Sequence, residues 1–543
     1  MNDELRGQVR DWIAADPDPV TRAEMEKLLA TDDAEVARRF AHSLSFGTAG
    51  LRGPEEAGPA GMNRLTVRRA TQGVLAWLEA QGRDLSRGVV VGRDARMGSE
   101  SFHDEVVSVL RTAGATVFDW PTPLPTPLVP FAVRELHAVA GVMITASHNP
   151  PRDNGYKLYD ADGSQINAPH DAVVEAAMRA AGPLAIAAVP GEVRTLGDDL
   201  LSRYTDELVA RFRCDHGVTL AYTPLHGVGG ALTTRLLEEC GHRVIATPAQ
   251  FEPDGRFPTV AFPNPEEQGA LDLVCAAADA AGADLILAND PDADRLGVAV
   301  RDSGKWRILR GDEIGWLLGA AALESARPGD VVATSLVSST LLATMAEAAG
   351  VPCVITPTGF KWIGRAGAPA RLCFGYEEAL GYAVDSRVGD KDGVSAALAM
   401  AHLAAQLAGE GRTLLDRLDE IAERYGVVGV ENVTIRLEGH DALTRIAATM
   451  AALRDAPPTS LGGRAVVGPV DLRQGWRDVA PLDGVLWPLE GGGRVLVRPS
   501  GTEPKVKAYL EVIDGGDGTL AERRRRVEAA GAAVAADVRA LLG

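Results

Sequence analysis

Apolar and polar positions follow two kinds of spacing along this chain. Within the first 45 residues, Leu29, Val36, Phe40 and Leu44 recur at helix-like spacing among mixed charges, which predicts helices. Beyond them, short apolar runs of strand length alternate with helix-spaced segments. Alternation of strand, helix and strand is typical of a layered α/β fold with mostly parallel sheets.

The first block of this pattern predicts a strand that runs into a loop over 88–96, a helix at 101–114 that ends at Gly114, and strands at 115–120 and 138–146. The later blocks predict a strand within 217–230, a strand at 242–248, and a strand that runs into a loop over 283–295. They predict further strands at 331–339, 352–358, 428–437, 493–500 and 505–512. Each block ends a strand in a polar loop. We therefore expect four domains, over residues 1–200, 201–305, 306–425 and 426–543.

Charge narrows the classes of partner. The 543 residues carry 55 Lys+Arg against 74 Asp+Glu, a formal net charge of −19. An overall field of this sign repels nucleic acid and anionic membranes, so we expect neither as a partner. If the protein handles an anion, the positive charge must be gathered in a pocket.

Cysteine usage and the apolar runs bear on the compartment. The five cysteines are widely spaced and form no CxxC pair, which argues against a disulfide framework or a zinc site. The N-terminal residues lack the basic segment and apolar stretch of a secretory signal, and no apolar run has the length of a membrane span. We expect a cytoplasmic protein.

The first polar loop that carries chemistry is TASHNPPRDNGYKLY (145–159). Ser147 follows the predicted strand 138–146, and the prolines after it prevent a helix from starting there. A hydroxyl at a strand end, with His148 beside it and Lys157 downstream, is a candidate nucleophile. The alternative is a polar turn whose side chains only satisfy backbone groups.

The second loop, NDPDADR (289–295), carries Asp290, Asp292 and Asp294. Carboxylates this close repel one another, and a hard cation removes that cost. Oxygen ligands without the EF-hand spacing favour Mg²⁺ over Ca²⁺. A solvated acidic turn is the alternative.

Three further segments follow in the third block. TPTGFKW (356–362) places Lys361 after a Thr-Gly turn, FGYEEALGY (374–382) carries Glu377 and Glu378, and DKDG (390–393) supplies Lys391. Paired glutamates can accept hydrogen bonds from sugar hydroxyls. A solvated helix start remains the alternative.

The fourth block offers RPSGTEPK (498–505) between two predicted strands. Arg498, the hydroxyls, the glycine backbone and Lys505 together suit a phosphate group. A polar hairpin is the alternative, and the Walker pattern GxxxxGK[ST] is absent. The four blocks together predict an enzyme that transfers phosphoryl groups. They offer a nucleophile, a cation site, hydrogen-bond acceptors for sugar hydroxyls and a phosphate-binding loop.

These loops, in this order, resemble those of the phosphohexomutase superfamily of phosphoglucomutases and phosphomannomutases. The resemblance extends from SFGTAGLRG (45–53) to RPSGTEPKVKAY (498–509). GTAGLRG, NPEEQGAL (264–271), TGFKW and GYEEALGY are most similar to the branch of longer phosphoglucomutases and phosphopentomutases.

The resemblance implies a fold and a set of roles. It implies four domains around a central cleft, the first three layered α/β with mixed, mostly parallel sheets and the fourth a smaller α+β domain.

The resemblance also implies that Ser147 carries a phosphoryl group and binds Mg²⁺ together with Asp290, Asp292 and Asp294. Lys157 matches the general acid or base, with His148 as a further candidate, and Arg52 lies near the transferring phosphate. The matched binding positions are Thr358, Glu377 and Lys391 for the sugar, and Arg498, Ser500, Gly501 and Thr502 for the other phosphate. Arg295 is expected beside the transferring phosphate, because positive charge is needed there to offset the carboxylates and the phosphoserine. We also expect Lys361 and Lys505 to bind the anionic substrate.

The implied activity is that of an isomerase, a phosphosugar mutase that interconverts sugar 1-phosphate and 6-phosphate through phosphoserine and a bisphosphate, with glucose as the first expectation. A sugar 1,6-bisphosphate is the expected activator. Phosphopentomutase, phosphomannomutase and glucose 1,6-bisphosphate synthase remain alternatives on the same site, because Ala379 stands where many glucose and mannose enzymes have serine. A metal-dependent phosphatase and a sugar-phosphate sensor are alternatives of other classes. We expect a small phosphosugar as partner and a monomer or homodimer.

Overall fold

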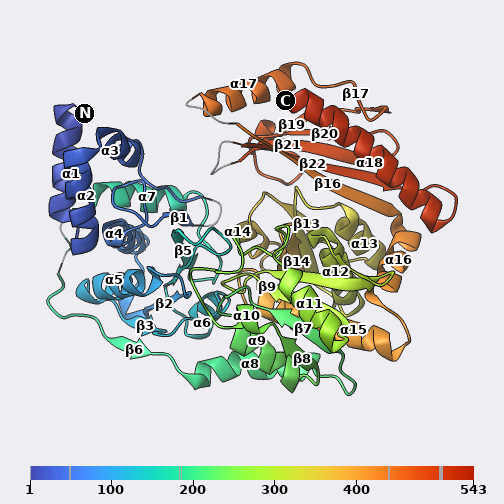
Figure 1. The fold of residues 1–543 in the computed structure, drawn as a ribbon, viewed down its shortest axis with the longest axis horizontal. Helices are drawn as coiled ribbons and strands as arrows, with labels where there is room; N and C mark the ends of the chain where they lie inside the picture. The colour runs from blue at the N-terminus through green and yellow to red at the C-terminus, as the bar shows by residue number, and fades with distance from the viewer. Residues whose placement is uncertain (1, 48–49, 183, 185, 438–440, 501–504) are drawn as a thin grey trace. The chain divides into compact units, whose positions relative to one another are not determined.

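A computed structural model describes residues 2–47, 50–182, 184, 186–437, 441–500 and 505–543. The chain forms two compact units (Figure 1). The first unit comprises Met1–Ile308 and Gly381–Gln406, and the second comprises Leu309–Leu380 and Leu407–Gly543.

The first unit begins with three helices, as predicted: α1 (Asp3–Ala15), α2 (Pro19–Thr31) and α3 (Asp33–Phe40). Each has a side-chain cap, because Asn2, Asp18 and Asp32 accept hydrogen bonds from backbone N–H groups of the first helical turn. Their apolar faces meet in a small core that also includes residues further along the chain: Val9, Trp12, Met25, Val36, Ala57 and Leu65.

The first sheet has the strand order β1-β5-β4-β2-β3-β6. Its strands are β1 (Leu51–Pro54), β2 (Val89–Arg93), β3 (Val117–Asp119), β4 (Ala140–Ile144), β5 (Asp153–Asp160) and β6 (Val193–Thr195). β2, β3, β4 and β6 pair in parallel, whereas β5 is antiparallel to β4 and β1. The accompanying helices are α4 (Arg64–Ala80), α5 (Ser99–Thr112), α6 (Leu128–Glu135) and α7 (His170–Ala180), with a 3₁₀ turn at Leu85–Arg87.

The strand β5 corrects one expectation. The sequence places Lys157 in a loop, but it lies on β5, opposite Met143 of β4. The physical reason is the alternation along the strand, since Tyr156 and Leu158 are fully buried in the apolar core and Lys157 lies between them in sequence. The lysine is therefore held by a strand register rather than by a loop.

The second sheet of this unit has the order β11-β10-β9-β7-β8. β7 (Thr219–Thr223), β8 (Arg243–Ala246) and β9 (Leu285–Asn289) are parallel, and β10 (Leu296–Asp302) and β11 (Lys305–Ile308) continue the sheet antiparallel. The helices are α8 (Asp198–Phe212), α9 (Gly230–Glu239), α10 (Pro248–Phe251) and α11 (Asp272–Ala281). The returning segment adds β15 (Gly381–Ala383) and α15 (Gly393–Gly409), and Gly381 forms a β-bridge with Arg295.

The second unit contains a parallel group of strands in which β12 (Asp330–Ser335) lies between β13 (Cys353–Thr356) and β14 (Arg371–Glu377). Its helices are α12 (Gly311–Glu324), α13 (Leu341–Ala349), α14 (Phe360–Ile363) and α16 (Leu414–Tyr425). An antiparallel sheet of order β16-β22-β21-β20-β19 follows.

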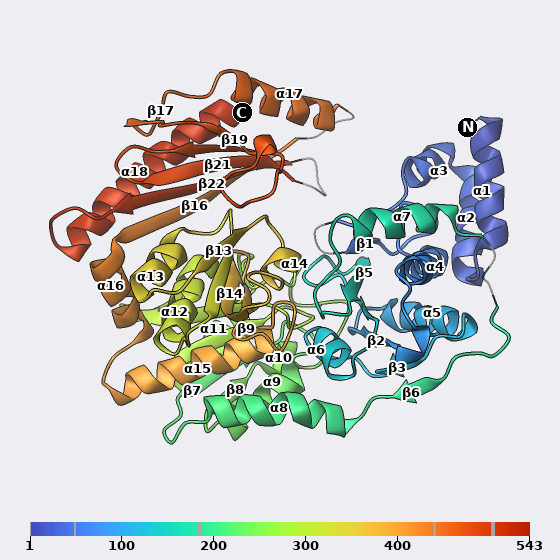
Figure 2. The ribbon, with the colours of Figure 1, turned by 180° about the vertical axis from the view of Figure 1, so that it is seen from behind.

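The strands of that antiparallel sheet are β16 (Val427–Arg436), β19 (Val470–Asp471), β20 (Val485–Pro488), β21 (Gly493–Pro499) and β22 (Lys505–Asp514). Helix α18 (Leu520–Leu542) lies along the sheet beside β16 and β22 (Figure 2). The unit also contains α17 (Ala442–Asp455), a 3₁₀ turn at Leu472–Gln474 and a ribbon of β17 (Ser460–Leu461) and β18 (Arg464–Ala465). Three groups with parallel strands followed by an antiparallel sheet with helices confirm the predicted fold class.

Within the part of the chain that the structure describes, no helix combines the length and apolar character that crossing a bilayer requires.

Candidate active site

Ser147 lies three residues after the end of β4, in the turn that leads to β5. Its backbone has a φ of 53°, in the left-handed region that non-glycine residues seldom adopt. The N–H of Ser147 donates to Oγ1 of Thr145 at 2.9 Å, which secures the turn. The buried hydroxyl donates to Oδ2 of Asp290 at 2.8 Å, although 143 residues separate the two in sequence.

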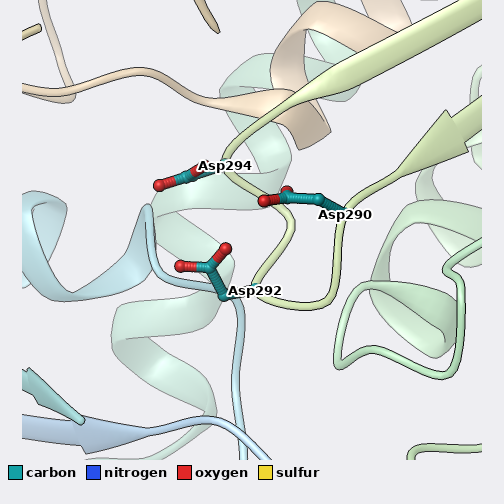
Figure 3. A group of neighbouring side chains, drawn as sticks. All are labelled: Asp290, Asp292 and Asp294. Atoms are coloured by element: carbon teal, nitrogen blue, oxygen red, sulfur yellow. The ribbon is translucent and has the colours of Figure 1, made fainter. Parts of the chain in front are cut away.

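Asp290, Asp292 and Asp294 gather in the turn between β9 and β10 (Figure 3). One oxygen of each carboxylate lies within 4.8 Å of the others, and all three side chains are fully buried. Asn289 supports the turn, because its amide donates to the carbonyl of Arg295 at 2.7 Å. A short strand-to-strand turn thus presents three carboxylates to one point.

Burial and mutual repulsion act on these groups unequally. Burial, and then the charges of Asp292 and Asp294, raise the pKa of Asp290 well above its usual range. Burial also disfavours the ionised form of Asp292, but the charge and hydrogen bond of Lys157 outweigh it and lower the pKa of that carboxyl. The pKa of Asp294 is likewise lowered, because Lys157 and Lys391 outweigh burial and the charge of Asp292.

The donor set fits a hard divalent cation. Oδ1 of Asp292 and Oδ1 of Asp294 are buried and have no hydrogen-bond partner within the part of the chain that the structure describes. Buried acceptors without partners are costly, and a cation coordinated by oxygen would satisfy them. A divalent cation would also favour the ionised form of Asp290.

Two lysines reach the carboxylate cluster. Nζ of Lys157 lies 2.6 Å from Oδ2 of Asp292 and 2.6 Å from Oδ2 of Asp294. Nζ of Lys391 lies 2.9 Å from the same oxygen of Asp294. Both side chains are buried, so these charge-assisted contacts operate at a low local dielectric.

Two arginines complete the positive charge of this centre. Arg52 on β1 donates from Nη1 to Oδ1 of Asn149 at 3.2 Å, while its Nε is buried without a hydrogen-bond partner among the described residues. Burial lowers the pKa of Arg52, and the charges of Asp292 and Asp294 oppose that effect. The N–H of Arg295 donates to Oδ1 of Asp290 at 3.0 Å. The structure thus brings Arg52, Lys157 and Arg295 around the three carboxylates. It also brings Lys391 there, a residue that the resemblance assigns to the sugar.

His148 is the other predicted proton carrier. Its Nδ1 lies 3.1 Å from Oγ of Ser147 and 3.9 Å from Oδ2 of Asp290. Burial, followed by the charges of Arg295 and Arg52, lowers the pKa of His148 well below its usual range. A neutral imidazole beside the serine hydroxyl is able to accept a proton.

The remaining predicted residues lie in the second unit. Glu377 is the buried last residue of β14, and the N–H of Glu378 donates to Oγ of Ser338 at 3.1 Å. Lys361 lies on the short helix α14 and Thr358 is half-buried just before it. Burial raises the pKa of Tyr509, the charges of Glu378 and Glu377 raise it further and Arg498 opposes them. Of the predicted residues, Glu377 and Arg498 therefore lie near Tyr509.

The fourth loop closes a hairpin between β21 and β22. The N–H of Ser500 donates to the carbonyl of Lys505 at 2.8 Å, which pairs the two ends of the loop. Arg498 lies near the end of β21. The predicted Gly501 and Thr502 lie outside the described residues.

Two residues of this centre, Thr126 and Asn289, are not among the site residues that the sequence predicts. Thr126 donates from Oγ1 to Oδ2 of Asp292 at 2.7 Å, and Asn289 is fixed by the hydroxyl of Tyr222 at 2.8 Å. Thr126 belongs to the proline-rich segment PTPLPTPLVP, whose only sequence signal is a polar residue just before α6. Asn289 was visible as the last residue of the strand before the acidic turn.

Comparison with family models places this centre among known proteins. Residues 43–183, 202–304 and 310–425 match the phosphoglucomutase/phosphomannomutase alpha/beta/alpha domains I, II and III. Residues 480–539 match the C-terminal domain of the same family.

Individual relatives cover most of the chain. A protein of Haemophilus influenzae named "probable phosphomannomutase" is 40% identical over 83% of this chain and 93% of its own length. The phosphopentomutase of Mus musculus is 34% identical over 94% of this chain and 91% of its own length. A phosphoglucomutase/phosphomannomutase family protein of Burkholderia thailandensis has a similar fold, with a TM-score of 0.70 at 21% identity over 91% of this chain and 96% of that one.

Proposed function

The chain belongs to the phosphoglucomutase/phosphomannomutase family, and on that premise we propose that it is a phosphosugar mutase. It would interconvert a sugar 1-phosphate and the phosphate of the sugar's terminal hydroxymethyl group. Glucose phosphates are the first substrates to test. The observation that carries the proposal is the 2.8 Å hydrogen bond from Ser147 to Asp290, within a buried carboxylate cluster surrounded by lysines and arginines.

The proposed reaction consists of two phosphoryl transfers. The P–Oγ bond of phosphorylated Ser147 breaks as a bond forms from phosphorus to a free hydroxyl oxygen of the sugar monophosphate. That hydroxyl releases its proton to a base, and Oγ of Ser147 takes up a proton to become a hydroxyl. The product is a sugar bisphosphate. After it reorients, the bond from its other phosphorus atom to the sugar oxygen breaks as Oγ of Ser147 bonds to that phosphorus. The serine hydroxyl gives its proton to the base, the sugar oxygen takes up a proton, and the isomeric monophosphate leaves. A sugar 1,6-bisphosphate would restore an enzyme that has lost its phosphoryl group, and would therefore act as an activator.

Asp290, Asp292 and Asp294, with the phosphoryl group on Ser147, would hold Mg²⁺. When bound, this ion would offset negative charge on the transferring group. The protein's own cations serve the same purpose, since Arg52, Arg295, Lys157 and Lys391 lie around the cluster. Phosphoryl transfer depends mainly on positioning and charge compensation, which this arrangement supplies.

Two side chains are candidates for the proton. His148 lies 3.1 Å from Oγ of Ser147 and its lowered pKa keeps it neutral. Lys157 donates to two carboxylates at 2.6 Å, so we assign it first to holding those carboxylates and offsetting charge. A general base must lie within hydrogen-bond reach of the proton it takes. Substitution of each residue separately would identify which one carries the proton.

We assign substrate recognition to the second unit. Glu377 and Thr358 would accept or donate hydrogen bonds to sugar hydroxyls. The phosphate that is not transferred would bind Arg498, Ser500 and Lys505, with Lys361 as a further cation. The influence of Glu377, Glu378 and Arg498 on one tyrosine, Tyr509, supports a common binding region for sugar and phosphate.

A pentose phosphate is the second candidate substrate. It is favoured by Ala379, which removes a hydroxyl beside the sugar-binding glutamate, and by the similarity to the mouse phosphopentomutase. The chemistry on Ser147 would be the same. Only the contacts to the sugar would differ.

The test is turnover of the purified protein on glucose, mannose and ribose 1-phosphates, with Mg²⁺ and a sugar bisphosphate present. We expect conversion to the isomeric monophosphate without release of inorganic phosphate. Stoichiometric release of phosphate would instead indicate a metal-dependent phosphatase. No conversion of any of the three, in protein whose intact mass shows phosphorylated Ser147, would contradict the proposal.

A further inference from the structure

Arg96 holds the turn that carries Ser147. It lies just after β2 and is 3% exposed. Nη2 donates to the carbonyls of Ser147 and Asn149, each at 2.6 Å. Nη1 donates to the carbonyls of Pro150 and Asp153, each at 2.8 Å. One guanidinium therefore binds four backbone carbonyls, three in the turn after β4 and one at the first residue of β5.

Arg96 is itself held from three directions. Its Nε lies 3.3 Å from Oδ2 of Asp94, and its backbone N–H donates to Oδ1 of the same residue at 3.0 Å. Ser99 donates to that Oδ1 at 2.5 Å, which orients the carboxylate. The ring of Phe257 lies under the guanidinium, with its centroid 5.0 Å away. The side chain has little freedom to leave its position.

The geometry requires an arginine. The four carbonyls accept hydrogen bonds from two nitrogens of one planar guanidinium. The single ammonium group of a lysine cannot reproduce this arrangement. Because Nη2 binds the carbonyl of Ser147, it fixes the peptide that follows the left-handed φ of 53°. The same backbone conformation directs the serine hydroxyl toward Asp290.

We propose that Arg96 is a positioning residue for the phosphoryl transfer: it holds Ser147 in the strained backbone conformation that places Oγ against the carboxylate cluster. The inference rests on the proposed function for its catalytic consequence. Arg96 contacts neither the carboxylates of the cluster nor Oγ in the described structure. It acts through the backbone of the turn.

The experiment compares Arg96→Lys with the matched control Arg39→Lys. Arg39 is also buried in the first unit and binds Glu24, Glu35 and the carbonyl of Ala57, away from Ser147. For both variants and the wild type, kcat and KM are measured with glucose 1-phosphate, Mg²⁺ and glucose 1,6-bisphosphate, or with whichever of the three sugar 1-phosphates the wild type converts. Amide hydrogen exchange over residues 147–153 and the thermal midpoint are measured in parallel.

We expect R96K to lower kcat by about 100-fold, since misplacement of a reacting group by about 1 Å has effects of that size. KM should change by less than about threefold, and exchange over 147–153 should accelerate. R39K should lower the thermal midpoint but leave kcat and that exchange near wild type. If R96K retains wild-type kcat, or if R39K loses as much kcat, the inference is wrong.

A second variant covers a failure of R96K to fold. Asp94→Asn retains the bond to the backbone N–H of Arg96 but removes the charge beside Nε, so we expect the same changes at a smaller size, and unchanged kcat and exchange would overturn the inference. If the wild type converts no sugar phosphate, the proposed function fails. In that case faster exchange at 147–153 in R96K still supports the role of Arg96 in holding the turn, and unchanged exchange overturns it.

Discussion

The hydroxyl of Thr126 donates a 2.7 Å hydrogen bond to Asp292, and its backbone N–H donates to the carbonyl of Asp292 at 2.8 Å. Thr126 precedes α6 beside the first sheet, whereas Asp292 lies in the turn after β9. The two contacts join the segment before α6 to the turn that carries the carboxylates. They also orient Asp292 for a cation.

Thr126→Val should therefore weaken Mg²⁺ binding by about 10-fold, because partners of a metal ligand typically contribute that much. Mg²⁺-dependent activity over a range of metal concentrations measures the effect. Thr126→Ser keeps the hydroxyl and should restore the affinity. Thr205→Val, at a buried threonine of α8, is the matched control and should not change it.

Ser147→Ala should abolish mutase turnover and remove the phosphoryl group from the intact mass of the protein. The reason is that, among the residues that the structure describes, Ser147 is the one whose hydroxyl donates to Asp290, and the reaction needs a covalent acceptor. The control is Ser101→Ala, which removes the hydroxyl of an exposed serine on α5 and should leave turnover at the wild-type rate. Turnover at the wild-type rate in folded S147A would refute the phosphoserine route.

Mg²⁺ should stabilise the folded chain. Cation binding satisfies the orphaned oxygens of Asp292 and Asp294 and relieves repulsion in the cluster. A 100-fold excess of Mg²⁺ over its Kd corresponds to about 2.7 kcal/mol. The thermal midpoint should thus rise with MgCl₂ but not with NaCl at equal ionic strength.

The matched variants for this stabilisation are Asp292→Asn and Asp279→Asn. Asp279 is exposed and pairs with Arg301 outside the cluster. We expect the midpoint of D292N to be insensitive to Mg²⁺ and that of D279N to follow the wild type. Equal Mg²⁺ stabilisation of all three proteins would argue against the cluster as the metal site.

The pH dependence of the second unit offers a separate test. Burial raises the pKa of Asp312 from 3.8 to about 6, although its Oδ1 accepts hydrogen bonds from Ser339 N–H and Tyr376 OH, both at 2.8 Å. The nearby charges are Glu511, which raises this pKa, and Arg494, which lowers it. Between pH 4 and 6 the folded state binds more protons than the unfolded one, so stability falls as pH rises through this window.

Asp312→Asn removes this dependence and keeps an acceptor for both donors. At about 1.36 kcal/mol per pH unit, D312N should be more stable than wild type at pH 7 by up to about 3 kcal/mol. The advantage should disappear near pH 4. The measurement is the thermal midpoint of each protein across this pH range. A difference in midpoint that stays constant at every pH would mean that the substitution acts through packing and not through the raised pKa of Asp312.

Sugar preference should respond to Ala379. Ala379→Ser introduces a hydroxyl next to the paired glutamates, and a site that forms a hydrogen bond to its substrate discriminates against an analogue that cannot form it. We expect the ratio of kcat/KM for glucose 1-phosphate over ribose 1-phosphate to rise by about 10-fold. An unchanged ratio would show that the side chain at position 379 does not contribute to discrimination between the two sugars.

The fold and the strand-end loops could be predicted because they depend on local pattern. The apolar run before Ser147 and the run DLILA before Asp290 each predict a strand, and polar groups at strand ends mark sites in α/β proteins. The order of the loops along the chain carries the resemblance to the phosphohexomutases, and their combined chemistry predicts that they act together.

What the sequence could not show were pairings between distant segments. Lys157 follows two prolines, and its burial only becomes visible when β5 is placed beside β4. Arg96 and Thr126 act through contacts to residues 51 and 166 positions away, respectively, and nothing in their neighbourhoods signals those partners. Such roles depend on tertiary placement.

The pairing of β4 with β5 has a consequence for how this protein can tolerate insertions and deletions. Side chains alternate between the two faces of a strand, so a slip of one residue moves every side chain to the opposite face. One residue gained or lost between Thr145 and Arg152 would carry Lys157 toward the apolar core and turn Tyr156 or Leu158 toward the carboxylates. The spacing from Ser147 to Lys157 is therefore constrained by parity, and length changes in this turn should be far less acceptable than substitutions.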